Sequence, residues 1–220
     1  MNKAILRIVG IALVVAPAAI GIAQKNKPTQ ATYITKEEVD KVNATPGVDR
    51  TIRVVDIGDQ HFSVGIIHRG KTGGAAPAAA AAGGGAARGG AAATPPANTQ
   101  PCGERTGTSS GASGIAHDKQ TEGYYIVSGA GTMVTGGRIL NGRTSAPDSE
   151  VTTTLNGPSC SGQIAGTDVV KRDVKVGDII IIPAGVPHGW ADIPDHVDYL
   201  SFRPSADILT VGYEHPALKK

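Results

Sequence analysis

The chain has 220 residues, a length that fits one domain, and carries 21 Lys and Arg against 19 Asp and Glu. Lys3 and Arg7 account for the excess positive charge, so the chain from residue 24 onward is formally neutral. Proteins that bind nucleic acid present a basic surface to the phosphates, and we therefore expect no nucleic-acid partner.

Residues 1–23 have the features of a secretory signal peptide. The segment starts with basic residues and continues as an apolar run over residues 8–23. It ends with Gly21 and Ala23, the small residues that a signal peptidase requires. A membrane anchor is the alternative, but Pro17 interrupts the run, which is short for a span of about 20 residues. We expect an exported chain, periplasmic or secreted, with no membrane association after cleavage.

Residues 24–220 are expected to form a single domain that begins with a short helix and a hairpin within residues 30–69. Thr35 and Glu38 match a capping box and predict a helix that continues to about Val42. Residues 50–56 and 61–68 alternate between polar and apolar side chains around a Gly58-Asp59 turn, a pattern that predicts a β-hairpin.

The segment 70–101 consists almost entirely of Gly, Ala and Pro and has no hydrophobic periodicity. Such a sequence cannot bury enough apolar surface to offset the entropy lost on ordering. We therefore predict a flexible, low-complexity insertion between two parts of one domain.

Residues 102–213 are expected to form the core of the domain as an all-β sandwich or barrel. Short β-prone runs alternate with Gly-rich turns in this region, and no long helical pattern occurs. The predicted strands are residues 114–117, 122–127, 132–135, 138–140, 151–155, 169–176, 179–182 and 197–202. The four isoleucines at 179–182 predict a buried strand, and the Pro- and Gly-rich bend after them delivers His188 in a fixed position.

Cys102 and Cys160 both lie in loops rich in Gly, Ser and Pro. In an oxidising compartment they are candidates for a disulfide, and two free thiols are the alternative. Two cysteines without a C-x-x-C spacing do not indicate a zinc site.

His117 and Glu122 are candidate partners of His188 because they flank a polar turn and can both point into a barrel. An ionised Glu122 beside Tyr124 and Ile126 would be costly to bury, and a divalent cation would cancel that cost. Two imidazoles and one carboxylate are a common ligand set for Fe, Mn, Zn, Ni or Co.

Each of these side chains also has a structural interpretation. Glu122 can be protonated or paired with Arg138 or Lys119, and the histidines can be ordinary barrel residues. His61 and His68 are seven residues apart and face opposite sides of a regular strand, so they cannot both join the site. We expect both to be ordinary strand or surface histidines, and a third imidazole from one of them is the alternative.

The spacing of these residues resembles the two sequence motifs of the cupin superfamily. The second motif, G-x5-P-x-G-x2-H-x3-N, is matched by Gly177, Pro183, Gly185 and His188, with Asp192 in place of Asn. In the first motif, G-x5-H-x-H-x3,4-E-x6-G, the second His, the Glu and the last Gly fall on His117, Glu122 and Gly129. The resemblance covers about residues 110–203. It implies a jelly-roll β-barrel, the double-stranded β-helix, with the site inside.

The first motif also departs from the family pattern. Its leading Gly falls on Ser109 and its first His on Ile115, so the fourth ligand of a three-His, one-Glu site is missing. Ile115 has the same parity as His117 and is expected to line the interior. We expect Tyr124 and Trp190 to be core residues. Tyr124 shares a face with Glu122, and Trp190 shares one with His188, so both are also candidates to line the pocket.

Two functions follow from the resemblance. The first is a divalent-metal protein that acts on a small molecule, with isomerase- or dioxygenase-like chemistry. The second is a metal-free cupin that binds a small ligand or has a structural role, which the loss of the ligand at Ile115 favours. A homodimer is compatible with both.

Overall fold

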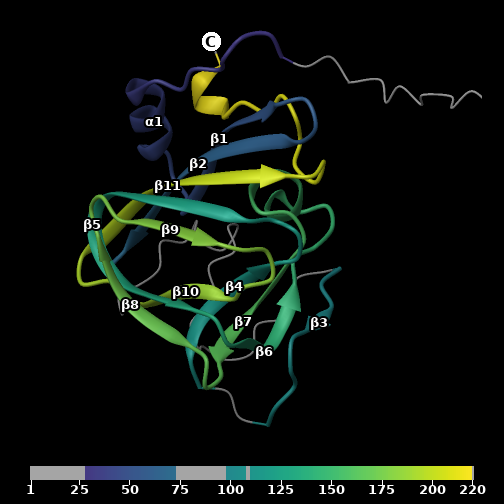
Figure 1. Ribbon diagram of the computed structural model, residues 1–220, viewed down its shortest axis with the longest axis vertical. Helices are drawn as coiled ribbons and strands as arrows, with labels where there is room; N and C mark the ends of the chain where they lie inside the picture. The colour runs from purple at the N-terminus through teal and green to yellow at the C-terminus, as the bar shows by residue number, and fades with distance from the viewer. Residues whose placement is uncertain (1–27, 73–97, 108–109, 220) are drawn as a thin grey trace, which may run out of the picture.

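The structure is a computed structural model that describes residues 28–72, 98–107 and 110–219 (Figure 1). The predicted signal peptide, residues 1–23, and most of the predicted Gly/Ala insertion lie outside the described residues. None of the helices in the described part of the chain is long and apolar enough to cross a bilayer.

The described residues form one short α-helix, eleven strands and two further helical turns. In chain order these are α1 (Lys36–Asn43), β1 (Asp49–Asp56), β2 (His61–Gly70), β3 (Pro101–Cys102), β4 (Ala112–His117), β5 (Glu122–Thr135), β6 (Arg138–Thr144), η2 (Val151–Leu155), β7 (Ser159–Ala165), β8 (Val170–Lys175), β9 (Ile179–Ile182), β10 (His188–Asp192), β11 (His196–Ser205) and η3 (Pro216–Leu218).

The strands form a single antiparallel sheet that curls into a barrel (Figure 1). The hydrogen-bonded path runs β1-β2-β11-β5-β10-β4-β7-β6-β3, and both β8 and β9 also pair with β5. The 14-residue strand β5 joins the two sides, because its first half pairs with β9 and β11 and its second half with β8 and β10. This confirms the predicted all-β jelly roll with a short N-terminal helix.

Helix α1 begins where the capping box predicts. The Thr35 hydroxyl accepts a hydrogen bond from the backbone N–H of Glu38, and the Glu38 carboxylate accepts one from the N–H of Thr35. The helix buries Val42 against Ile52 and Ile66 on the outer face of the β1–β2 hairpin. Figure 1 shows α1 beside β1, with the C-terminal segment next to it.

The predicted strand at residues 151–155 is wrong: Val151–Leu155 is a single π-helical turn. Asn156 N–H donates to the Val151 carbonyl, and the hydroxyl groups of Thr152 and Thr153 donate to the carbonyls of Ala146 and Ser149. Hydroxyl side chains that bond the local backbone in this way compete with pairing to another strand, which β-branching alone does not reveal.

The isoleucine run is a strand, but the prediction that it is wholly buried is wrong. Strand β9 pairs with β5, and its side chains alternate between the two faces of the sheet. Ile182 is 3% exposed in the barrel core, whereas Ile179 and Ile181 are 69% and 67% exposed. The largest apolar cluster fills the barrel beside the site, with Ile67, Tyr124, Ile126, Met133, Val174, Ile182, Ile193, Val197 and Tyr199.

Candidate metal centre

Three strand ends bring the predicted ligands together. His117 is the last residue of β4, Glu122 is the first of β5, and His188 is the first of β10. The bend before β10 depends on Gly185, whose φ of 81° is a left-handed conformation that glycine adopts without strain. The N–H of Gly185 donates to the His117 carbonyl over 2.7 Å, which fixes the bend against β4.

The imidazoles of His117 and His188 converge on one carboxylate oxygen of Glu122. Glu122 Oε2 lies 3.0 Å from Nε2 of His117 and 3.0 Å from Nε2 of His188. The three ligand atoms all lie within 4.8 Å of one another, and all three residues are buried. The structure therefore places two imidazole nitrogens and one carboxylate oxygen around a common point.

The hydrogen bonds of the opposite ring nitrogens indicate which nitrogen carries the proton. His188 Nδ1 lies 3.0 Å from the Val186 carbonyl, which can only accept, so Nδ1 is the donor. Ser159 Oγ donates to the Gly157 carbonyl and therefore accepts from Nδ1 of His117 over 2.8 Å. With Nδ1 as the donor, the neutral His188 ring directs the lone pair of Nε2 toward Glu122 Oε2, whereas Nε2 of His117 lies at hydrogen-bond distance, 3.0 Å, from the same oxygen.

A lone pair of His188 that faces the Glu122 carboxylate would be stabilised by a positive charge between the two groups. Among the described residues, His188 Nε2 is a buried polar atom without a hydrogen-bond partner, since its approach to Glu122 lacks hydrogen-bond geometry. Two ligands about 2.1 Å from one ion and at right angles are about 3 Å apart, which is close to the distance from each Nε2 to Glu122 Oε2. The donor set thus fits a divalent cation, with positions left open for water or a small molecule.

The other oxygen of Glu122 has different partners, which sequence reasoning missed. Arg203 Nε donates to Oε1 over 2.6 Å, and the Ser201 hydroxyl donates to it over 3.2 Å. The guanidinium of Arg203 also pairs with Asp49 at 2.6 Å and with the Leu155 carbonyl at 2.9 Å. Arg203 is on β11 with the same parity as Ser201, so extending the alternation of that strand by one residue would have indicated it.

These contacts set the ionisation of the site. Burial alone would raise the pKa of Glu122, but the charge of Arg203 and the contacts with the two histidines hold it well below its usual value. Burial lowers the pKa of His117 although Glu122 opposes the shift, so the neutral ring is favoured. Burial raises the pKa of Tyr124 well above its usual value, and its hydroxyl donates to Glu122 Oε2 over 2.7 Å.

Comparisons with known proteins give similarities of fold alone. No family model matches the chain, and no curated protein matches its sequence. Solved structures with related folds include an uncharacterised double-stranded β-helix protein of Klebsiella pneumoniae, with 16% identity and a TM-score of 0.35 over 81% of this chain and 94% of that one. The strand order described above decides the architecture. The chain has the cupin fold.

Two further solved structures with related folds are enzymes. An oxalate oxidase in complex with glycolate has 13% identity and a TM-score of 0.30, over 75% of this chain and 55% of that one. The oxalate decarboxylase of Lactobacillus farciminis has 8% identity and a TM-score of 0.28, over 74% of this chain and 34% of that one. The chain thus spans about half the length of the oxidase and about a third of the decarboxylase.

The predicted pocket residues lie around the centre of the cupin barrel. Ile115 is the direct cross-strand partner of His188 and is 7% exposed. Its side chain therefore occupies the same face, at the position of the missing ligand. Tyr124 packs edge-on against the His188 ring at 6.2 Å, whereas Trp190 is half-buried and packs at a tilt against Tyr199 in the apolar core.

The remaining sequence candidates lie elsewhere in the structure. His61 contacts Leu209 and Asp207, and His68 pairs with Asp198, so neither reaches the centre. Arg138 pairs with Glu104, and Lys119 is exposed, so the predicted alternatives for neutralising Glu122 are replaced by Arg203.

Cys102 and Cys160 are joined by a disulfide that links β3 to β7.

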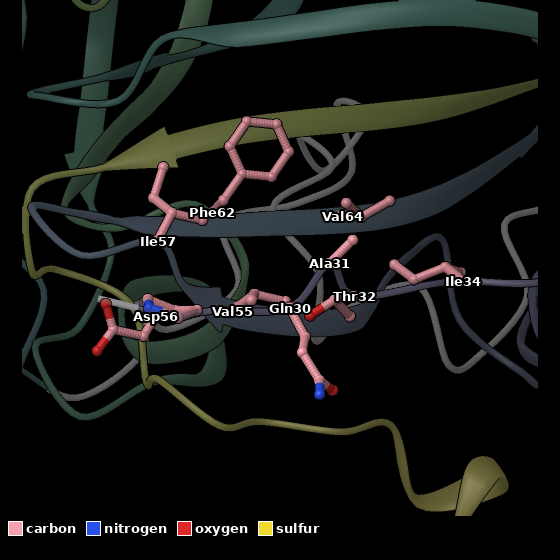
Figure 2. A pocket seen from close by; sticks show the side chains of 10 residues that line it. Gln30, Ala31, Thr32, Ile34, Val55, Asp56, Ile57, Phe62 and Val64 are labelled. Carbon is pink, nitrogen blue, oxygen red and sulfur yellow. The ribbon is translucent and has the colours of Figure 1, made fainter. Parts of the chain in front are cut away.

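A pocket of about 350 Å³ lies on the outside of the barrel, away from the candidate metal centre. Figure 2 shows its lining: Phe62 and Val64 from β2 face the segment 30–34, with Val55 and Ile57 at the end of β1. The lining is mainly apolar, and Asp56 is the one carboxylate among these lining residues. This pocket is distinct from the site inside the barrel.

Proposed function

We propose that the protein binds one divalent metal ion through Nε2 of His117, Nε2 of His188 and Oε2 of Glu122, and that a small molecule binds at this centre. The observation that carries the proposal is His188 Nε2, a buried lone pair aimed at the shared oxygen and without a hydrogen-bond partner in the described chain. A bound ion of this kind polarises a substrate or activates O₂, as in isomerase- or dioxygenase-like reactions.

The protein's own side chains hold the centre in a fixed arrangement. Ser159 and Val186 lock the two imidazoles through Nδ1, so that each ring presents Nε2 to the centre. Tyr124 remains protonated because burial raises its pKa, and its hydroxyl therefore acts as a hydrogen-bond donor beside the centre. Ile115 supplies an apolar wall next to His188.

Metal analysis of the purified protein tests this proposal. After removal of metals and reloading with Mn, Fe, Co, Ni or Zn, we expect about one ion per chain for the wild type and much less for His188→Ala. The matched control is His68→Ala, which removes a histidine that is 46% exposed and distant from the centre. Equal metal content in the wild type and His188→Ala would overturn the proposal.

The second candidate is a metal-free cupin that binds a small ligand or has a structural role. Two observations favour it: Arg203 already offsets the charge of Glu122, and Ile115 occupies the position of a fourth ligand. Thermal unfolding with and without divalent ions separates the two candidates, because binding to the native state must raise the midpoint. Midpoints unchanged by every metal tested would favour the metal-free function.

We also propose that the chain is exported, on the basis of the signal-like segment 1–23. Mass spectrometry of protein recovered from the periplasm or the culture medium should give an N-terminus at Gln24. A homodimer remains a separate proposal, and light scattering of the mature protein tests it.

A further inference from the structure

The candidate metal centre is connected to the side of the barrel by a buried chain of three charged side chains. Glu122 at the centre pairs with Arg203, and Arg203 pairs in turn with Asp49 at the start of β1. Arg203 is 1% exposed, and the side chain of Asp49 is 10% exposed. We propose that Arg203 and Asp49 are positioning residues that determine how Glu122 binds the metal, an inference that rests on the proposed metal site.

The guanidinium of Arg203 is held from several directions. Nε donates to Glu122 Oε1 at 2.6 Å, while Nη1 and Nη2 donate to the two oxygens of Asp49 at 3.2 and 2.6 Å. Nη1 also donates to the Leu155 carbonyl at 2.9 Å. Because the planar guanidinium has its donors in a fixed fork, these bonds define the orientation of the whole group.

A fixed Arg203 makes the two oxygens of Glu122 unequal. Oε1 accepts hydrogen bonds from Arg203 and Ser201, whereas Oε2 faces the two imidazoles and accepts a hydrogen bond from the Tyr124 hydroxyl. The carboxylate can then offer only Oε2 to an ion and binds it through one oxygen. Without Arg203, Glu122 could rotate and offer both oxygens, which would raise the coordination number of the ion.

Asp49 acts on the centre through charge. Its carboxylate offsets the positive charge of Arg203, which would otherwise repel a cation bound beside Glu122. Asp49→Asn keeps the size of the side chain and one oxygen acceptor but removes the negative charge. This variant therefore weakens metal binding without removing any ligand.

The experiment uses Co(II) alone as the probe, added to the mature protein after metals have been removed. For Asp49→Asn we expect the Kd for Co(II) to rise about tenfold, within the range for residues that support a metal ligand. For Arg203→Gln we expect the visible absorption of bound Co(II) to lose intensity, since a higher coordination number weakens these bands.

The matched control is Arg50→Gln. Arg50 is also a buried arginine, but it bonds Asn43 and Thr45 at the C-terminal end of α1 and makes no contact with Glu122 or Arg203. If Arg203→Gln acted only by lowering the stability of the fold, Arg50→Gln would change the Co(II) spectrum in the same way. We expect its Co(II) spectrum to match the wild type even if its melting temperature falls.

Each outcome decides the inference. A folded Arg203→Gln with the wild-type spectrum, or Asp49→Asn with the wild-type Kd, would overturn it while leaving the proposed function intact. If Arg203→Gln does not fold, Asp49→Asn alone decides, because its nearly isosteric change is compatible with folding. Absence of Co(II) binding by the wild type would instead overturn the proposed function and this inference with it.

Discussion

Arg203 Nε donates to Glu122 Oε1 over 2.6 Å inside the barrel, where both side chains are only 1% exposed. Burying a carboxylate without a partner would cost several kcal/mol, and Arg203 compensates for this whether or not a metal is bound. The pairing also leaves Oε2 for the two imidazoles. The same contact thus stabilises the fold and shapes the candidate centre.

The position of Ile115 predicts that the missing fourth ligand can be restored. Ile115 lies opposite His188 across β4 and β10 and two residues before His117, so Ile115→His places a third imidazole on the same face. We expect the affinity for Co(II) or Zn(II) to increase by more than about tenfold, because an added ligand contributes at least as much as an outer-shell partner. Titration calorimetry measures this, with Ile115→Leu as the control. Equal affinities for the two variants would contradict the placement.

The site ligands could be predicted from the sequence because their positions depend on the spacing of residues within short segments. The turn between β4 and β5 fixes the separation of His117 and Glu122, and the Pro- and Gly-rich bend fixes His188. Arg203 was missed because it follows Phe202 at the end of an apolar run, where an arginine normally indicates a solvent-exposed end. Its role depends on Asp49, 154 residues earlier, and no local pattern contains that contact.

Most of the fold could also be predicted from the sequence, and the elements that were predicted wrongly have physical explanations. Alternation and turn residues correctly predicted the β1–β2 hairpin and the capping box of α1. The isoleucines of β9 do not alternate in the sequence, so they concealed that one face of the strand is exposed. For residues 151–155, β-branching indicated a strand, but hydroxyl-to-backbone bonds stabilise a π-helical turn.

The two faces of β9 predict that identical substitutions change the stability by very different amounts. Ile182→Ala removes a side chain that is 3% exposed and should lower the free energy of unfolding by about 2–5 kcal/mol. Ile181→Ala, one residue earlier and 67% exposed, should change it by no more than about 0.5 kcal/mol. Urea unfolding of both variants measures the difference. Similar losses would argue against the alternation of β9.

The stability of the metal-free protein should decline in acid in two steps. Burial depresses the pKa of His117 in the folded state, so the unfolded chain takes up a proton first as the pH falls below the ordinary histidine value of 6.5. The free energy of unfolding is therefore greatest above pH 6.5 and falls through the lower pKa of folded His117. Glu122, whose folded pKa is below the ordinary value of 4.5, adds a second decline below that pH.

Urea unfolding in EDTA across this pH range measures both declines. His117→Gln should make the first decline shallower and leave the second in place. His215, whose pKa is lowered by burial and by the charge of Arg50, contributes to what remains of the first decline. A first decline of the same slope in wild type and His117→Gln would show that His117 is not neutral in the fold.

The disulfide between Cys102 and Cys160 should contribute substantially to stability. It closes a loop with a sequence separation of 58, for which the chain-entropy model gives about 4 kcal/mol. Addition of a reductant should lower the free energy of unfolding by an amount of this order. The double variant Cys102→Ser/Cys160→Ser should be less stable than the wild type and insensitive to reductant. A wild type whose stability does not respond to reductant would exclude this contribution.

The central claim is that His117, Glu122 and His188 form one metal centre, and anomalous scattering from a crystal of the Co(II)-loaded protein tests it most directly. We predict a single strong anomalous peak about 2.0–2.2 Å from Nε2 of both histidines and from Oε2 of Glu122. Arg203 should remain on Oε1 in the same crystal. An anomalous map with no peak between these three side chains would contradict the claim, whether or not Co(II) is bound elsewhere in the crystal.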